Sequence, residues 1–322
     1  MFANVSCLSI LIGMTSAVQT LCSQQNGAGR YKEVGITLQR SILILSFISL
    51  PIAAIWFNVT IIFRLFRIEE SVCIVMGNFL RVRILCIPID VINESYRQYL
   101  MAIGVMRPSM WGAVTFNLSL VVFNTLFVFV LKLGYECLAW SWVLSMFLCG
   151  LVQIGLSWSH PSVVRTMQPW DWAAWERWDE FVGLGLPGTV MMCSEWWAFE
   201  ILTMFASLLG TAEVGAQSLV LQTHTQAFMI ACGLGVVTTS LVGNALGANM
   251  KTLAVKIGRL VILSVVVVDL LVGLVLLLYG TNFVNLFTSD SSVLQIADSV
   301  VPFLAFSVTI KGIQGVATGL SQ

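Results

Sequence analysis

Long apolar segments dominate this sequence of 322 residues. Each is about 20 to 30 residues long, which is the length an α-helix needs to cross about 30 Å of hydrocarbon. Helices are expected rather than barrel strands, because short alternating segments are not seen and a helix satisfies its own backbone N–H groups in lipid. We therefore predict an all-α polytopic membrane protein, with spans at 1–24, 38–63, 80–104, 110–133, 137–158, 180–209, 214–243, 255–280 and 295–321.

Composition excludes several classes of protein. Hydrophobic residues make up 58% and charged residues 10% of the chain, and the net charge is zero, so no basic surface is available to nucleic acid. The eight cysteines lack the spacing of a zinc site or a disulfide framework. The sequence "GLGLPG" (183–188) satisfies GxGxxG but lies within an apolar helix, and no HExxH or GxSxG motif is present. We expect no enzymatic activity, no bound metal, no organic cofactor and no nucleic-acid partner.

The distribution of basic residues predicts an orientation. If "GNALGANMK" faces the cytosol, alternation of the helices places nine lysines and arginines inside and five outside, which agrees with the positive-inside rule. Inside lie Arg30, Lys32, Arg40, Arg107, Arg165, Arg177, Lys251, Lys256 and Arg259; outside lie Arg64, Arg67, Arg81, Arg83 and Lys132.

An internal repeat is visible at an offset of about 220 residues. Residues 13–32 align without a gap on 233–252, and 64–72 align on 285–293. The identities include Gly13 with Gly233, and Gly27 with Gly247. A repeat of this length predicts a parent architecture of six plus six helices, of which this chain would hold about nine and lack the first and the last two. Parallel six-helix repeats are typical of transporters, with the substrate site between the halves.

Several motifs carry a family resemblance. The chain resembles the eukaryotic branch of the multidrug and toxic compound extrusion (MATE) family in five motifs. They are "LPGTVMMCSEWWAFEIL" (186–202), "GAQSLV" (215–220), "VGNALGAN" (242–249), "TLCSQQNGAG" (20–29) and "IQGVATG" (313–319). The resemblance implies two lobes and export of organic cations or other amphiphiles in exchange for H⁺ or Na⁺. It further implies an N-terminal lobe at 1–158 holding family helices 2–6, a cytoplasmic linker at 159–179, and a C-terminal lobe at 180–322 holding helices 7–10.

The segment "CSEWWAFE" (193–200) places two carboxylates in an apolar helix. Each costs about 2.5–3.5 kcal/mol at the membrane centre, so a use or a partner is expected. A carboxylate there can exchange a proton or attract a cation, and Trp196 offers a cation–π face. Glu195 and Glu200 lie roughly 140° apart around a helix. We predict Glu195 as the main cation-binding residue with Glu200 in support; alternatively, both only bridge neighbouring helices.

Three positions depart from the family pattern. Gln19, Gln222 and Lys311 stand where the resemblance implies acidic residues. Lys311 would act as a permanent counter-ion to Glu195 or Glu200, which works against proton exchange. The three positions are candidate substrate- or ion-binding residues, and they leave the coupling ion open.

Three further polar residues are candidates for the same path. Asp90 maps onto Lys311 through the repeat, which predicts an ion pair between the lobes; alternatively, Arg83, Asp90 and Arg97 form a satisfied polar stripe at seven-residue spacing. Asp269 binds a coupling ion or only bonds to a neighbouring helix. His224, in "QTHTQ", titrates near neutral pH or serves as a structural hydrogen-bonding group.

These observations predict a secondary antiporter that works by alternating access. Two alternatives stay open: an altered family member that no longer transports and acts as a regulatory or interaction protein, and a helical receptor. We expect a small-molecule substrate, a monomer in a lipid bilayer, and the plasma membrane, with a vacuolar or other organelle membrane as the alternative location.

Overall fold

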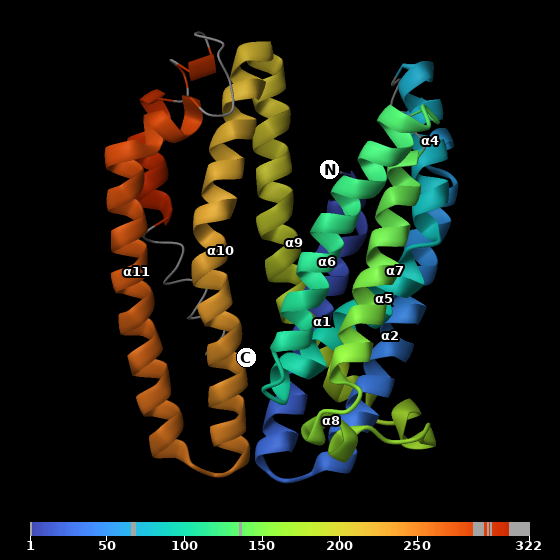
Figure 1. Cartoon of the computed structure of the whole chain (residues 1–322), viewed down its shortest axis with the longest axis vertical. Coiled ribbons are helices and arrows are strands. Elements are labelled where there is room, and N and C mark those ends of the chain that lie inside the picture. The colour runs from blue at the N-terminus through green and yellow to red at the C-terminus, as the bar shows by residue number, and fades with distance from the viewer. Residues whose placement is uncertain are drawn as a thin grey trace. The chain divides into compact units, whose positions relative to one another are not determined.

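The computed structural model describes residues 2–65, 69–134, 137–285, 293–294, 296 and 298–308, and every regular element in these ranges is a helix (Figure 1). This confirms the predicted all-α class. The elements are η1 (Asn4–Leu8), α1 (Ser9–Gly27), α2 (Tyr31–Phe57), α3 (Val59–Leu65), α4 (Glu70–Ile84), α5 (Ile87–Ala102), α6 (Arg107–Asn124), η2 (Thr125–Val130), α7 (Cys137–Ser157), α8 (Pro161–Thr166), η3 (Trp172–Trp175), α9 (Trp178–Leu209), α10 (Thr211–Gly247) and α11 (Lys251–Asn285).

Six of the described helices are long and apolar enough to cross a membrane, and the bent pair α4–α5 makes a seventh if it counts as one span. Helix α9 has 32 residues but is not among the six, since its carboxylates lower its mean hydropathy. Of the predicted span 295–321, residues 298–308 form a short apolar helix and the remainder from 309 onward lies outside the described residues. The chain is a multi-pass membrane protein.

One predicted span is not a single helix. The segment 80–104 divides between α4 and α5, which meet at an angle of 54°. Pro88 lies in the first turn of α5, and in an uninterrupted helix its ring would clash with the carbonyl of the fourth residue before it, Ile84, where α4 ends. The expectation of one continuous helix here was therefore wrong. Segment 38–63 divides as well, since α2 ends at Phe57 and α3 begins at Val59.

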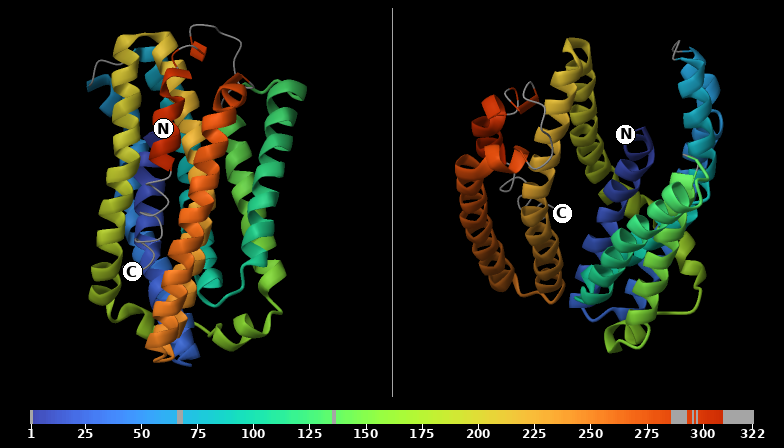
Figure 2. Two further views of the ribbon diagram at one scale, coloured as in Figure 1. Left: turned by 90° about the vertical axis from the view of Figure 1, so that its left-hand side faces the viewer. Right: turned by 45° about the horizontal axis from the view of Figure 1, so that its top comes forward.

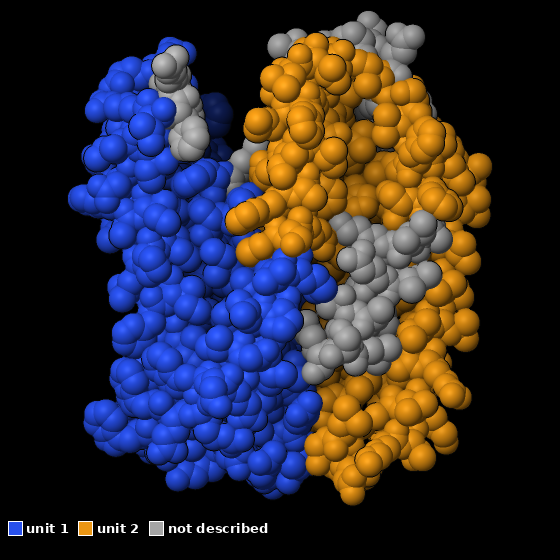
Figure 3. Space-filling model, turned by 180° about the vertical axis from the view of Figure 1, so that it is seen from behind, with its two compact units in different colours: residues 1–192 blue, residues 193–322 orange. Residues whose placement is uncertain are grey.

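The chain forms two compact units, Met1–Met192 and Cys193–Gln322, which Figure 3 colours separately. In the first unit, α1 packs against α2 and α5, and α6 packs against α7. Glycine permits a close approach between α1 and α9: a Cβ on Gly13 would lie 2.4 Å from the Cα of Thr189. Small residues let membrane helices pack at such short range, where packing rather than hydrophobicity holds them together.

In the second unit, α10 and α11 run side by side, as both views in Figure 2 show. Ala231 and Val265 are fully buried where they meet, with Phe228 and Leu234 packed against them. A separate apolar cluster joins α10, α11 and the helix at 298–308.

The turns α1–α2 and α10–α11 have the same backbone structure. Arg30 N donates to Gln25 O at 2.9 Å, and Met250 N donates to Ala245 O at 2.8 Å, a pair of bonds 220 residues apart. Gly29 has φ of 74° and Asn249 has φ of 59°, so both turns use a left-handed residue at the corresponding position. The sequence repeat is thus also a repeat of hydrogen bonding.

The segment between α7 and α9 is held against α2. Gln39 Nε2 donates to the carbonyls of Gln168 and Pro169, at 3.1 and 2.9 Å, and its Oε1 accepts from Asp171 N. A Cβ on Gly35 would lie 2.4 Å from the carbonyl oxygen of Thr166, so only glycine fits there. The whole segment therefore packs as part of the first unit.

Asp171 fixes the middle of this segment. Its carboxylate accepts from the backbone N–H of Ala173 at 3.0 Å and lies 3.1 Å from Lys32 Nζ. The hydrogen bond from Ala173, followed by that from Lys32, holds the pKa of Asp171 below its ordinary value. The ionised side chain is thus the form that stabilises this loop.

Candidate functional site

Helix α5 carries a buried polar face. Asp90, Asn93 and Gln98 are buried, and Glu94 and Arg97 are largely so, although α5 belongs to a membrane span. The helix contacts α1, α2 and α7. Residues three or four positions apart, such as Asp90, Asn93, Glu94 and Arg97, lie on one side of a helix, so they form a continuous face. Charged groups placed inside a membrane domain are functional candidates because their burial has a large free-energy cost.

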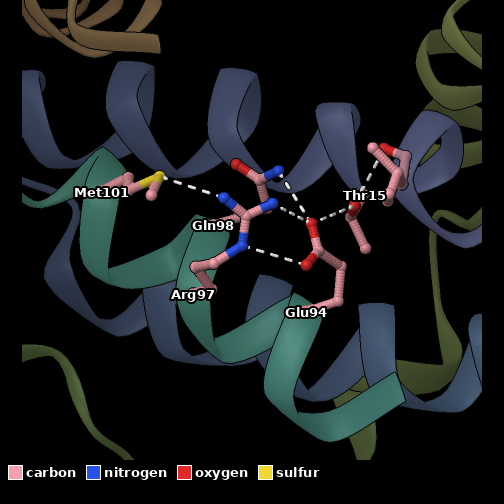
Figure 4. Close-up of polar contacts among 6 residues, drawn as sticks. Thr15, Glu94, Arg97, Gln98 and Met101 are labelled. Atoms are coloured by element: carbon pink, nitrogen blue, oxygen red, sulfur yellow. Dashed lines mark hydrogen bonds and ion pairs between the residues drawn. The ribbon is translucent and has the colours of Figure 1, made fainter. Parts of the chain in front are cut away.

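Glu94 is the centre of this face (Figure 4). Arg97 Nε donates to its Oε2 at 3.0 Å, and Arg97 Nη2 pairs with Oε1. Gln98 Nε2 and Thr15 Oγ1 donate to the same Oε1, at 3.1 and 3.5 Å. Three side chains from two helices thus hold one carboxylate in place. Arg97 Nη1 also contacts Met101 Sδ at 3.9 Å.

Asp90 lies one turn before Glu94. It is buried, and its Oδ1 accepts a hydrogen bond from Cys86 Sγ at 3.3 Å. Arg83, on α4, stacks over the ring of Trp142 at 4.0 Å instead of forming an ion pair with a described residue. Arg83 and Asp90 lie on either side of the bend between α4 and α5, and the stripe through Arg83, Asp90 and Arg97 stays a prediction. The predicted pairing of Asp90 with Lys311 falls on a residue outside the described ranges.

Gln19 is buried on α1, one helical turn beyond Thr15 and on the same face. It faces the same side of the helix as the hydroxyl that reaches Glu94. The structure thus buries Gln19 on the face of α1 that carries Thr15, and its binding role stays a prediction.

The three predicted residues of α9 occupy a continuous helix that runs through Pro187. Glu195, Trp196 and Glu200 are half-buried. Regular α-helical geometry keeps Glu195 and Glu200 on different faces, about 140° apart. The binding roles assigned to these side chains stay predictions.

The second unit contains a pocket of about 600 Å³. It is mostly apolar, and its polar side chains are Gln217, His224 and Ser307. Its lining comes from three helical segments: Phe199 and Leu202 of α9; Gln217, Val220, Leu221 and His224 of α10; and Val300, Phe303, Leu304, Phe306 and Ser307. An apolar cavity with a few polar groups is the usual form of a site for an amphiphilic molecule.

His224 is the predicted residue that reaches this pocket. It is buried, and its ring lies 5.8 Å from that of Phe199 and 6.4 Å from that of Phe228. Gln222, two residues earlier, is exposed on another face of α10. Glu195 and Glu200 are not among the pocket-lining residues, although Phe199 directly precedes Glu200.

Asp269 is buried in α11, with 1% of its surface exposed. Its Oδ2 atom has no hydrogen-bond partner among the residues that the structure describes. A buried carboxylate oxygen without a donor has a free-energy cost, and the role of Asp269 in binding an ion or a neighbouring helix stays a prediction. Within the described ranges, no three His, Cys, Asp or Glu side chains are grouped as a metal site would require.

Sequence reasoning missed Glu94, Thr15 and Gln217. Glu94 had a visible signal, because it precedes Arg97 by three residues, the spacing of ion pairs along a helix. Thr15 had none, since its role depends on which helices become neighbours, whereas Gln217 lies in "GAQSLV" (215–220), a motif of the family resemblance that does not by itself mark this side chain as a site residue.

A family model described as MatE matches residues 1–130 and 187–322. The chain belongs to the MATE family. Its relatives include multidrug and toxin extrusion protein 2 of Mus musculus, 30% identical over 302 residues, and protein 1 of Homo sapiens, 30% identical over 304 residues. Each match covers 94% of this chain and 53% of the relative, so the MATE chain described here spans about half the length of these relatives.

Solved MATE structures share the fold. The eukaryotic MATE transporter AtDTX14 superposes with a TM-score of 0.89 and 25% identity, covering 99% of this chain and 72% of that one. The Vibrio cholerae MATE transporter VcmN in its bent form gives a TM-score of 0.83 at 18% identity, covering 100% and 73%. The predicted MATE-like fold is confirmed, and the family consists of transporters rather than enzymes.

Proposed function

We propose that this MATE protein is a secondary antiporter that exports small amphiphilic organic cations in exchange for H⁺ or Na⁺ by alternating access. The observation that carries the proposal is the pair of carboxylates, Glu195 and Glu200, half-buried in the membrane-length helix α9. Their combined insertion cost is about 5–7 kcal/mol before compensation, and carboxylates inside a membrane domain mark ion and proton pathways. The names of the curated relatives, which refer to multidrug and toxin extrusion, support the substrate class.

The second unit suggests how a cation binds. We assign the charge contact to Glu195, with Trp196 as a cation–π face and Glu200 in support. The apolar part of the molecule occupies the pocket lined by His224 and Gln217. Asp269, whose Oδ2 lacks a described partner, is the second candidate for the coupling ion.

The remaining predicted residues take secondary roles in this proposal. Asp90 and Gln19, both buried, contribute to the polar surroundings of Glu94 in the first unit and do not contact the substrate directly. Gln222 contributes a polar contact from the other face of α10, and Lys311 acts as a counter-ion to the α9 carboxylates. We place the protein in the plasma membrane as a monomer.

Transport in proteoliposomes tests the proposal. Purified protein is reconstituted, and efflux of a fluorescent lipophilic cation is followed with a pH gradient, with a sodium gradient and with neither. We expect a gradient to drive efflux, and Glu195→Gln to reduce the rate about 10- to 100-fold, because a charged contact is worth about 1.5–3 kcal/mol. The control is Glu213→Gln, at the first turn of α10, where a carboxylate outside the proposed path is removed.

Two results would contradict this assignment. Equal rates in the wild type and Glu195→Gln would remove the role of Glu195. The absence of gradient-driven efflux in every condition would reject antiport. It would favour the alternative that this family member no longer transports and acts as a regulatory or interaction protein.

A further inference from the structure

One end of the first unit gathers basic side chains. The α1–α2 turn, the α5–α6 turn and the segment between α7 and α9 lie together there, since a hollow brings Asn26 and Tyr31 together with Ile103 and with Arg165. The basic residues of this end are Arg30, Lys32, Arg40, Arg107, Arg165 and Arg177; Arg40 is buried, and its Nη2 donates to the carbonyl of Ala173 at 3.0 Å. The positive-inside rule assigns this end to the cytoplasm, where the membrane leaflet carries anionic lipids.

Arg107 differs from the other basic residues at this end. Three of them form ion pairs, Arg30 with Glu33, Lys32 with Asp171 and Arg177 with Glu180. Arg165 stacks over the ring of Tyr31 at 3.5 Å. Arg107 is exposed and has no such partner among the residues that the structure describes. Its charge is therefore available to an external anion.

Arg107 lines a pocket of about 460 Å³ at the start of α6. The turn from Gly104 to Met106 forms one wall, and its backbone is fixed, because Val105 N donates to Leu100 O at 2.8 Å and Gly104 has φ of 78°. His160 lies at the same pocket. These residues form a cavity in a well-defined turn rather than a flat patch.

His160 supplies a second donor. Its Nδ1 accepts from Ser162 N at 3.3 Å and caps α8. Because Nδ1 is the acceptor, the neutral ring carries its proton on Nε2, at the other end of the imidazole. The pocket thus has a guanidinium from α6 and a ring N–H from the residue that precedes α8.

Apolar side chains continue the pocket toward the membrane. Trp111 lies one turn beyond Arg107 on α6, and Leu156 lies one turn before His160 at the end of α7; both line the pocket and are 51% and 56% exposed. Helix α6 therefore presents Arg107 at its start and Trp111 one turn deeper, while Leu156, near the end of α7, lines the same pocket as His160, which precedes α8. Tryptophan is favoured at this depth of a membrane.

We propose that this pocket binds an anionic phospholipid of the cytoplasmic leaflet. The lipid phosphate contacts Arg107 and His160 Nε2, and an acyl chain lies along Trp111 and Leu156. The charge complementarity selects an anionic headgroup, and the adjoining exposed apolar side chains select a lipid over a free phosphate ion.

Native mass spectrometry of the full chain in detergent tests the proposal. The probes are phosphatidylserine, phosphatidylcholine and inorganic phosphate. We expect one tight adduct of phosphatidylserine, weaker phosphatidylcholine binding, and no displacement by inorganic phosphate. Arg107→Gln is expected to weaken the phosphatidylserine adduct about fivefold, the equivalent of about 1 kcal/mol per basic residue at an anionic surface.

Two variants control for changes in folding and overall charge. Arg107→Lys keeps the charge and should retain most of the binding. Arg81→Gln removes an exposed arginine from α4, away from this pocket, and should leave the adduct unchanged. The proposal is overturned if Arg107→Gln binds like the wild type, if both lipids bind equally, or if inorganic phosphate displaces the lipid.

Discussion

The ion pair between Glu94 and Arg97 provides a quantitative test of the α5 polar face. Replacing Arg97 with Met removes two donors from Glu94 and leaves it Gln98 and Thr15. The two side chains are 17% and 31% exposed, which places the pair between a surface and a fully buried one. Removing one partner costs about 0–1 kcal/mol at a surface and about 3–5 kcal/mol when buried. We expect Arg97→Met to lower the free energy of unfolding by about 2–3 kcal/mol.

The reverse change and the double change complete the cycle. Glu94→Gln leaves a cation without its anion, and we expect a similar loss of about 2–3 kcal/mol. The double variant replaces both charges by neutral groups and should lose only about 1–2 kcal/mol, because no uncompensated charge remains.

Unfolding of the four proteins in mixed micelles, by adding denaturing detergent, measures these free energies. Arg81→Met, which removes an exposed arginine, controls for the loss of a positive charge. If the two single losses add in the double variant within about 0.5 kcal/mol, the side chains are not coupled and the reasoning is refuted.

Three other changes test the packing of the turns and of the segment before α9. Gly35→Ala brings a methyl group against the carbonyl of Thr166 and should destabilise by about 1–3 kcal/mol in the same unfolding assay; no loss would show that the segment moves freely. Asn249→Val should cost about 1–2 kcal/mol because a β-branched residue resists a φ of 59°, whereas Asn249→Gly should be tolerated; equal stability of both variants would contradict this. Because the folded pKa of Asp171 is lowered, its stabilising effect is present above its ordinary value of 3.8 and is lost as pH falls through the folded value. The stability difference between the wild type and Asp171→Asn should therefore shrink below about pH 4 in thermal unfolding, and a constant difference would exclude this linkage.

Helix location was predictable from the sequence, since long segments in which apolar residues dominate favour helices in a membrane protein. The segments 137–158 and 180–209 correspond to α7 and α9 within two residues at each end. The bend before α5 was not predicted, although Pro88 is visible in the sequence, because proline is common inside membrane helices and Pro51 and Pro187 do lie in continuous helices. The effect of a proline depends on whether neighbouring helices accommodate it.

The candidate site was predictable only in part. Burial of Asp90 and Asp269 follows from the apolar residues around them in the sequence and is seen in the structure, whereas the burial of His224, which lies in the polar run "QTHTQ", depends on which helices pack against α10. The convergence of Gln217, His224 and Phe303 on one pocket brings together segments far apart in the sequence, so no spacing along the chain reports it.

The packing of the segment between α7 and α9 has a practical consequence for tagging this protein. A surface stretch of that length is ordinarily where a fluorescent reporter, an epitope or a protease site is inserted. Here Gln39 forms hydrogen bonds with three backbone groups of this segment, and Arg40 Nη2 donates to the carbonyl of Ala173 at 3.0 Å. An insertion near residue 170 would therefore break the contacts between this segment and α2. The α10–α11 turn, where Met250 is exposed, is the better place for a label.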